Sequence, residues 1–273
     1  MTVIQAVILG IVQGLTEFLP VSSSAHLVLV PFLLNWQLDP TQAFVFDVLV
    51  QLGTLGAVIA YFWKDLLEIL KAWSAGIRSR QPFAEANSRL GWLVILATIP
   101  AGLAGLLLKD TVESAFSDPM LTAVMLFVTA VLLTLSELLT KKTRETAQLT
   151  WLDSLIIGLF QAASIFPGIS RSGATISGGL FRGLKRQDAA RFSFLLAIPI
   201  MTAAGAMALK DLFAMPGLVS MLPVVVVGFV IAGLVGYFVI RWFLGFLRTR
   251  SLLPFALYCA LVSAAVLLVM GIR

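Results

Sequence analysis

The amino-acid sequence predicts an all-α integral membrane protein with six transmembrane helices and two re-entrant helix-loop-helix hairpins. Three observations support this: strong hydrophobicity, six apolar stretches of spanning length, and two apolar regions that polar residues interrupt. Of the 273 residues, 59% are hydrophobic and only 12% are charged. A soluble domain of this size carries more polar surface. The isoelectric point near 9.7 does not indicate nucleic-acid binding, because the charges form short clusters between apolar runs.

The predicted spans are close to the ~20 residues that a helix needs to cross a bilayer. They cover residues 44–63, 90–108, 119–139, 189–209, 218–240 and 252–271. The interrupted regions are 2–36 and 151–184, and their arms are too short to span alone. We therefore expect each of them to enter and leave the membrane on the same face.

The N-terminal segment and the cysteine content exclude other classes. Residues 1–25 partly resemble a signal peptide, but no basic residue precedes the apolar run and Gln13 and Glu17 interrupt it. We do not expect cleavage. The single cysteine, Cys259, lies in a hydrophobic run, so the sequence predicts neither a disulfide framework nor a zinc cluster.

Charge asymmetry supports this layout. Of the 19 Lys and Arg residues, 15 fall on one predicted face, three (Lys109, Lys210 and Arg273) fall on the other, and Arg171 lies in the second interruption. The positive-inside rule then predicts that both termini lie outside the cytoplasm. The first hairpin would start from the outer side and the second from the inner side, so their tips would meet in the bilayer.

The two halves of the chain also repeat. Pro20 matches Pro167 and Ser23 matches Ser170 at an offset of 147 residues, and Lys64-Asp65-Leu66 matches Lys210-Asp211-Leu212 at an offset of 146. One hairpin plus three spans is an odd number of crossings, so the halves would be inverted. We predict a first repeat over 1–140 and a second over 141–273. Chance alignment of small residues and leucines is the alternative.

The first interruption combines a carboxylate, serines and a histidine. Gln13 and Glu17 share one helix face, and Ser22-Ser23-Ser24 follow Pro20 at the start of a new helix, where serine caps well. His26, the only histidine, is three residues beyond Ser23, a spacing that suits a nucleophile and its base. Structural alternatives are a bond from Glu17 to a helix terminus or to Arg171, and a purely structural histidine.

The second interruption reads Pro167-Gly168-Ile169-Ser170-Arg171-Ser172-Gly173-Ala174-Thr175. Glycines permit close backbone approach, hydroxyls add hydrogen-bond donors, and the arginine fork suits phosphate oxygens. Two helix N-termini next to an arginine form an anion site. The ligand predicted by this pattern is a phosphate.

With Gln13-Gly14-Leu15-Thr16-Glu17-Phe18-Leu19-Pro20 and Ser22-Ser23-Ser24-Ala25-His26, these residues resemble the paired motifs of the bacitracin-resistance type of undecaprenyl-diphosphate phosphatase. The resemblance covers essentially the whole chain. It implies hydrolysis of a C55 prenyl diphosphate to the monophosphate and inorganic phosphate, which recycles the lipid carrier of cell-wall synthesis and confers bacitracin resistance. It also implies a site on the outer (periplasmic) side of the bacterial plasma membrane, and a divalent cation such as Mg²⁺ or Ca²⁺.

The resemblance implies a role for each matching residue. Ser23 would be the nucleophile and His26 its general acid/base, while Glu17 would orient His26 or help hold the metal ion. The family's first motif begins with Glu or Gln, and here it is Gln13, so Glu17 would act as the only carboxylate of the motif.

Other residues would bind the diphosphate. Arg171 would do so and stabilise the charge that develops during transfer, helped by Gln13, Ser22, Ser170, Ser172 and Thr175. Asp47 and Gln51 are further candidates for completing the site.

Three rival functions can be compared with the sequence. A transporter or flippase of prenyl phosphate fits the inverted repeat and stays open. A lipid phosphatase of the phosphatidic-acid type uses two histidines, whereas this chain has only His26. An ion channel lacks support because there is no repeated filter sequence. A homodimer is an open alternative to a monomer.

Overall fold

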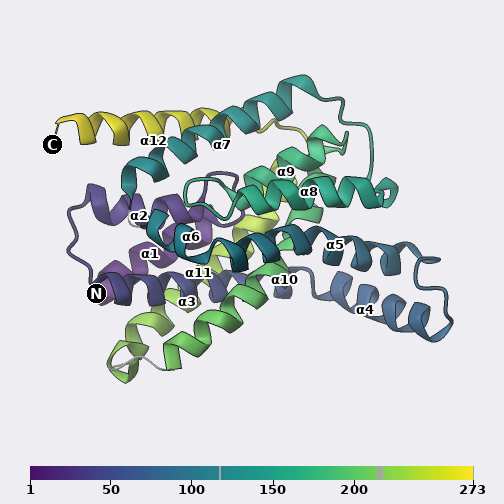
Figure 1. Ribbon diagram of the computed structural model, residues 1–273, viewed down its shortest axis with the longest axis horizontal. Helices are drawn as coiled ribbons and strands as arrows, with labels where there is room; N and C mark the ends of the chain where they lie inside the picture. Colours follow the sequence, from purple (N-terminus) through teal and green to yellow (C-terminus); the bar gives the residue numbers. More distant parts are fainter. Residues whose placement is uncertain (117, 214–217, 273) are drawn as a thin grey trace.

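The computed structural model describes residues 1–116, 118–213 and 218–272, without the side chains of residues 40, 41, 44, 109, 113, 208–213 and 218–220. Within these residues the fold is helical and no β-strand is formed (Figure 1). The helices are α1 (Val3–Thr16), α2 (Ser23–Leu33), α3 (Pro40–Tyr61), α4 (Trp63–Arg78), α5 (Ala86–Leu107), α6 (Lys109–Ala115), α7 (Pro119–Leu139), α8 (Trp151–Ala163), α9 (Arg171–Phe181), α10 (Arg186–Phe213), α11 (Leu218–Phe246) and α12 (Leu253–Ile272), with a 3₁₀ turn at Thr146–Gln148.

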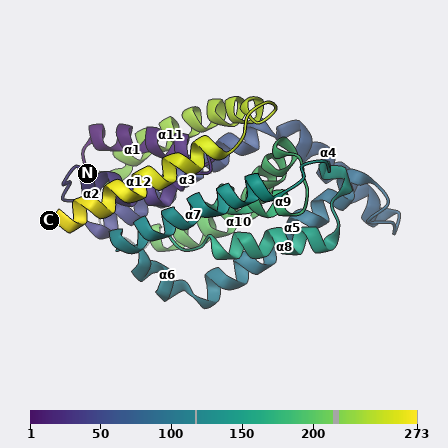
Figure 2. The same cartoon turned by 90° about the horizontal axis from the view of Figure 1, so that it is seen from above.

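A helix occupies each of the six predicted spans: α3, α5, α7, α10, α11 and α12. Five of them are long and apolar enough to cross a membrane alone, and α3 qualifies together with α4, from which it is bent by 73°. The all-helical membrane fold is therefore confirmed. Figures 1 and 2 show α7 and α12 running side by side over the rest of the molecule.

The sequence analysis did not predict α4, which lies in the connection between two spans. Its apolar residues recur at helical spacing and pack on α5, with Trp73 meeting Trp92 edge-on at a ring distance of 4.8 Å. The helix is amphipathic rather than uniformly apolar. A search for long apolar runs therefore passes over it.

Both interrupted regions are helix-break-helix units, as expected. α1 and α2 are joined by residues 17–22, and α8 and α9 by residues 164–170. Two hydrogen bonds connect the first break to the start of α9, from Arg171 to Glu17 and from Ser172 to the Leu19 carbonyl. The meeting of the two tips is thus confirmed, while their re-entrant path through a bilayer stays a prediction.

Glycines allow the short helices to pack closely on long ones. A Cβ at Gly158 of α8 would lie 2.6 Å from the carbonyl oxygen of Ala97 in α5. A Cβ at Gly10 of α1 would lie 2.8 Å from the carbonyl oxygen of Gly228 in α11. Small residues permit such close approach of helices in membranes. The two hairpins therefore pack on α5 and α11 in a corresponding way, which fits related halves; the repeat boundaries at 140 and 141 stay a prediction.

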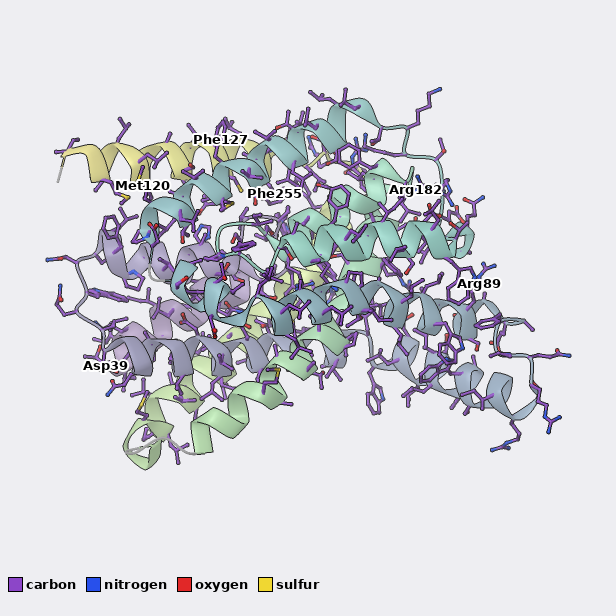
Figure 3. The ribbon with its side chains drawn as sticks, viewed as in Figure 1. Asp39, Arg89, Met120, Phe127, Arg182 and Phe255 are labelled. Atoms are coloured by element: carbon purple, nitrogen blue, oxygen red, sulfur yellow. The ribbon has the colours of Figure 1, made fainter. Side chains whose placement is uncertain are left out.

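The start of α1 and the end of α12 lie at the same end of the molecule, at the left of Figure 1. Arg89 and Arg182 lie at the opposite end, as Figure 3 shows, and Asp39 and Met120 lie near the termini. We call the end with Arg89 and Arg182 the basic end. This arrangement agrees with the predicted charge separation. The side chains of Lys109 and Lys210, the matched Asp211-Leu212 side chains, and Arg273 lie outside the described residues.

Replacing Gly158 by Val should destabilise the protein, because the new side chain meets the Ala97 backbone, which cannot give way cheaply. Overpacking typically costs about 1–3 kcal/mol. The buried thiol of Cys259 becomes reactive on unfolding, so a thiol-reactive fluorophore can measure the melting temperature in detergent. We expect a clear decrease in that temperature.

Gly102→Val is the matched control, because a Cβ at Gly102 of α5 has no heavy atom within 4 Å. Equal melting temperatures for the two variants would contradict the close α8–α5 contact.

Candidate active site

The first break positions a buried carboxylate. The Phe18 side chain is fully buried and meets Phe194 of α10 edge-on at 5.3 Å, which fixes the chain just after α1. Glu17, only 8% exposed, accepts hydrogen bonds at Oε2 from Gln13 Nε2 at 2.9 Å and from Ser23 Oγ at 2.6 Å. The carboxylate therefore joins the end of α1 to the start of α2.

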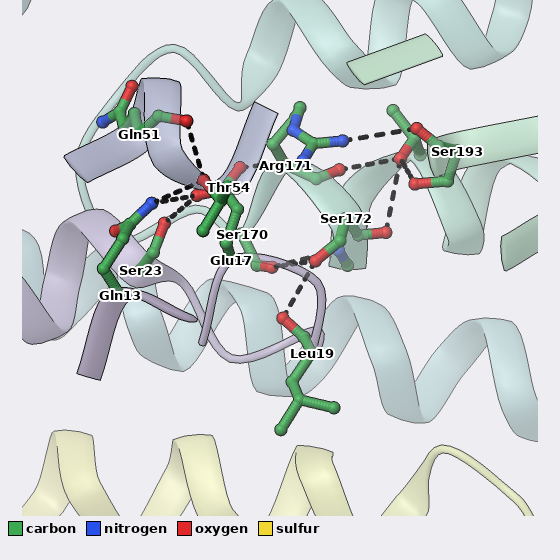
Figure 4. A network of polar contacts seen from close by, with 12 residues as sticks. Gln13, Glu17, Leu19, Ser23, Gln51, Thr54, Ser170, Arg171, Ser172 and Ser193 are labelled. Atoms are coloured by element: carbon green, nitrogen blue, oxygen red, sulfur yellow. Dashed lines mark hydrogen bonds and ion pairs between the residues drawn. The ribbon is translucent and has the colours of Figure 1, made fainter. Parts of the chain in front are cut away.

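The other oxygen of this carboxylate binds the second break. Arg171 Nη2 donates to Glu17 Oε1 at 2.8 Å, and both side chains are largely buried (Figure 4). Charge-assisted hydrogen bonds of this kind are stronger than neutral ones. The sequence left open the alternative that Glu17 pairs with Arg171, and the structure shows this pair.

Hydroxyl groups next to Arg171 in the sequence fix the first turn of α9, which carries this arginine. Ser170 caps α9 by accepting from Gly173 N at 3.0 Å, and its own backbone N–H donates to Thr129 Oγ1 of α7 at 3.0 Å. Ser172 Oγ donates to Leu19 O at 2.9 Å, and Thr175 Oγ1 lies 2.6 Å from Ser193 Oγ. These contacts fix the N-terminus of α9 against the first break.

Gly168 is required for the path of the second break. Its φ is +100°, a conformation that side chains rarely adopt, and a Cβ there would lie 2.3 Å from Thr122 O. The Gly168 carbonyl accepts from Thr129 Oγ1 at 3.0 Å. The Thr129 hydroxyl of α7 therefore bonds both the turn at Gly168 and Ser170, the N-cap residue of α9.

Backbone strain marks the start of α2. Ser22 has a φ of 67°, which is unfavourable for a residue other than glycine. Its side chain accepts from Ala25 N at 3.3 Å and lies 3.2 Å from Ser24 Oγ. Such strain clusters at functional sites, where the surroundings enforce it.

The two breaks border a cavity of about 290 Å³. Its polar lining is Glu17, Ser22, Ser23, Ser24, Gln51, Gln161, Ser164, Ser170 and Arg171. Its apolar lining is Ala101, Val112, Phe116, Ile165, Ile169, Ile200, Met201 and Ala204. A pocket lined by both polar and apolar side chains suits an amphiphile with a charged head.

Of the predicted site residues, the structure brings Glu17, Ser22, Ser23, Ser170 and Arg171 to this cavity. Gln13, Ser172 and Thr175 do not line it; their polar groups bond Glu17, Ser170 and Arg171, which do. Gln51, held as a further candidate, lines the cavity, whereas Asp47 does not.

The expected contact between Ser23 and His26 is wrong. Ser23 Oγ donates to Glu17, while His26 Nδ1 lies 2.7 Å from Ser22 O and His26 Nε2 lies 2.7 Å from Tyr258 OH of α12. Both ring nitrogens are thus engaged away from Ser23, because the side chain leans back over the first turn of α2 toward α12. Glu17 likewise does not orient His26.

Sequence reasoning missed several residues around the site. Thr54 accepts from Gln13 Nε2 at 3.3 Å, Ser193 O accepts from Arg171 Nη1 at 3.3 Å, and Tyr258 contacts His26. Gln161 lines the cavity, and its buried Oε1 has no hydrogen-bond partner among the residues that the structure describes. Gln161 lies in α8, 148 residues after Gln13, which is close to the offset between the two halves. The internal repeat therefore could have identified Gln161 as a candidate site residue.

The oxygen donors fit a divalent cation only when a ligand supplies further oxygens. Within the described residues, no three His, Cys, Asp or Glu side chains come together to hold a metal ion. The cavity offers one carboxylate, that of Glu17; the buried Oε1 of Gln13, which has no hydrogen-bond partner among the described residues, lies outside the cavity lining. Mg²⁺ is commonly bound by one or two carboxylates together with substrate phosphates.

Comparison with known proteins gives a consistent result. Residues 6–265 match the family described as bacitracin resistance protein BacA. The undecaprenyl-diphosphatase of Mycolicibacterium smegmatis is 44% identical over 273 residues, which cover 99% of this chain and 98% of that protein. The undecaprenyl-diphosphatase of Myxococcus xanthus is 43% identical over 258 residues, 94% of this chain and 86% of that protein. The chain therefore belongs to the BacA family.

Proposed function

We propose that this protein hydrolyses undecaprenyl diphosphate to undecaprenyl phosphate and inorganic phosphate, and so recycles the lipid carrier of cell-wall synthesis and confers bacitracin resistance. The observation that carries the proposal is the convergence of Glu17, Ser23 and Arg171 at a cavity with apolar walls. The undecaprenyl-diphosphatase relatives, similar over nearly the whole chain, support the same substrate.

Arg171 is the proposed phosphate-binding residue. Its guanidinium group borders the cavity at the N-terminus of α9, where backbone N–H groups and the helix dipole also favour an anion. Ser170 lies beside it and also lines the cavity. The apolar walls would receive the first isoprene units while the diphosphate occupies the polar side.

Ser23 is the proposed nucleophile and Glu17 its base. Ser23 Oγ would attack the terminal phosphorus, breaking the bond to the bridging oxygen, and the hydroxyl proton would pass to Glu17 and from there to the departing undecaprenyl phosphate. Water would then attack the phosphoserine and give its proton to Glu17. Inorganic phosphate leaves as Ser23 Oγ recovers a proton. Arg171 would stabilise the negative charge in both steps.

The geometry favours a positioning role for His26. A backbone carbonyl only accepts, so Nδ1 carries the hydrogen toward Ser22 O, and Nε2 accepts from the Tyr258 hydroxyl. The hydrogen bond from His26 Nδ1 therefore fixes the carbonyl group of Ser22, the residue that directly precedes Ser23.

A divalent cation is proposed as a cofactor. Glu17, the carboxylate that lines the cavity, would hold it together with the substrate. It would neutralise charge on the diphosphate oxygens.

The protein is a multi-pass membrane protein. We propose that it lies in the bacterial plasma membrane with the basic end toward the cytoplasm, both termini outside, and the active site accessible from the periplasmic side. The distribution of Lys and Arg over the two faces supports this orientation.

The decisive experiment measures phosphate release from undecaprenyl diphosphate by the detergent-purified protein, with and without a chelator. We expect release without the chelator and loss of it with the chelator, restored by added Mg²⁺ or Ca²⁺. A pure transporter would release no phosphate, which would overturn the proposed reaction. Release that is insensitive to the chelator would overturn the cation proposal alone.

Ser23→Ala and Arg171→Ala should each reduce turnover by orders of magnitude, because the first removes the nucleophile and the second the phosphate-binding charge. Ser24→Ala is the matched control, since Ser24 lines the cavity and its hydroxyl bonds Ser22 rather than Glu17. Acid-quenched protein incubated with terminally ³²P-labelled substrate should carry label only when Ser23 is present.

An unlabelled wild-type enzyme with full turnover would instead indicate direct attack by water.

His26→Ala should retain more phosphatase activity than Ser23→Ala, because His26 is proposed to position the site and not to transfer the proton. Lower activity of His26→Ala than of Ser23→Ala would instead indicate that His26 transfers the proton.

A further inference from the structure

A second cavity, separate from the active site, lies at the basic end. It has a volume of about 700 Å³, and its lining comes from the α3–α4 junction, the first turns of α10, and the end of α11 with the turn that follows it. It is lined by Tyr61, Phe62, Asp65, Gln187, Asp188, Arg191, Arg241, Leu244, Gly245 and Arg248. None of these residues belongs to the proposed reaction.

The acidic side chains of this cavity are already paired. Asp65 accepts from Arg191, and Asp188 accepts from the Thr146 backbone N–H at 2.9 Å and from the Thr146 hydroxyl at 2.7 Å. In contrast, Arg241 and Arg248 are exposed, and their side chains form no hydrogen bond or ion pair within the part of the chain that the structure describes. The cavity therefore has two free guanidinium groups and a positive surplus.

Arg241 lies in α11, whereas Arg248 lies in the turn that follows Phe246, the last residue of that helix; both line the cavity. Gly245 lies between them, and a Cβ there would meet no heavy atom within 4 Å. The wall between the arginines is thus open rather than filled. Each planar guanidinium can donate two parallel hydrogen bonds to a phosphate.

Two tryptophans locate the cavity relative to a bilayer. Trp63 and Trp242 directly neighbour lining residues and are 56% and 53% exposed. Tryptophan is enriched at the level of lipid headgroups. Tyr61 and Leu244 add an apolar wall, which a lipid can use and a free ion cannot.

We propose that this cavity binds the phosphate of an anionic phospholipid headgroup, with Arg241 and Arg248 as its ligands. Basic pockets between transmembrane helices are suited to anionic headgroups. Inorganic phosphate offers the same oxygen chemistry, so the test must separate the two sources.

The test measures binding of phosphatidylglycerol to the purified full-length protein by native mass spectrometry, with phosphatidylcholine of the same acyl chains as the comparison lipid. We expect preferential retention of phosphatidylglycerol. Arg241→Gln and Arg248→Gln should each weaken it about fivefold, the change that corresponds to about 1 kcal/mol per basic side chain. Gly245→Leu should also weaken it, because the new side chain occupies the space between the arginines.

Arg250→Gln is the matched control, since Arg250 is exposed and does not line the cavity. It should bind like the wild type, and all variants should keep their phosphatase activity, which shows that they are folded. Equal weakening by Arg250→Gln, equal retention of both lipids, or displacement of the lipid by inorganic phosphate at the lipid's concentration would each overturn the proposal.

Discussion

The ion pair between Glu17 and Arg171 joins residues 154 positions apart and connects the two breaks at the centre of the molecule. Removing two charges from water is costly, and such a pair is favourable only when its remaining hydrogen-bonding positions are filled. Here they are: Glu17 also accepts from Gln13 and Ser23, and Arg171 also donates to Ser193 O. The position of Ser23, and with it the proposed chemistry, depends on this pair.

The ion pair also explains why the two related hairpins contribute differently. The first break supplies the carboxylate and the proposed nucleophile, whereas the second supplies the cation. The hydroxyls of Ser172 and Thr175, which the sequence suggested as substrate ligands, instead fix α9 so that Arg171 meets Glu17. If the predicted inverted repeat holds, a symmetric framework carries an asymmetric site.

Hydropathy and charge were sufficient to predict the long helices and the meeting of the breaks, because length, apolarity and proline positions are local properties. They missed α4, whose amphipathic pattern is shorter than a span. They also could not determine the partner of Ser23. His26 is nearer in sequence, but its ring faces Tyr258 from α12, a contact 232 residues away that no local spacing encodes. Thr54 and Ser193 were missed for the same reason.

A double-mutant cycle on Glu17 and Arg171 tests the central claim most directly. The melting temperatures of Glu17→Gln, Arg171→Gln and the double variant would be measured in detergent through the reactivity of Cys259. Each single change leaves one buried charge without its partner, whereas the double change leaves none. The double variant should therefore lose clearly less stability than the sum of the two single losses. Additive losses would contradict a coupled pair as the link between the two breaks.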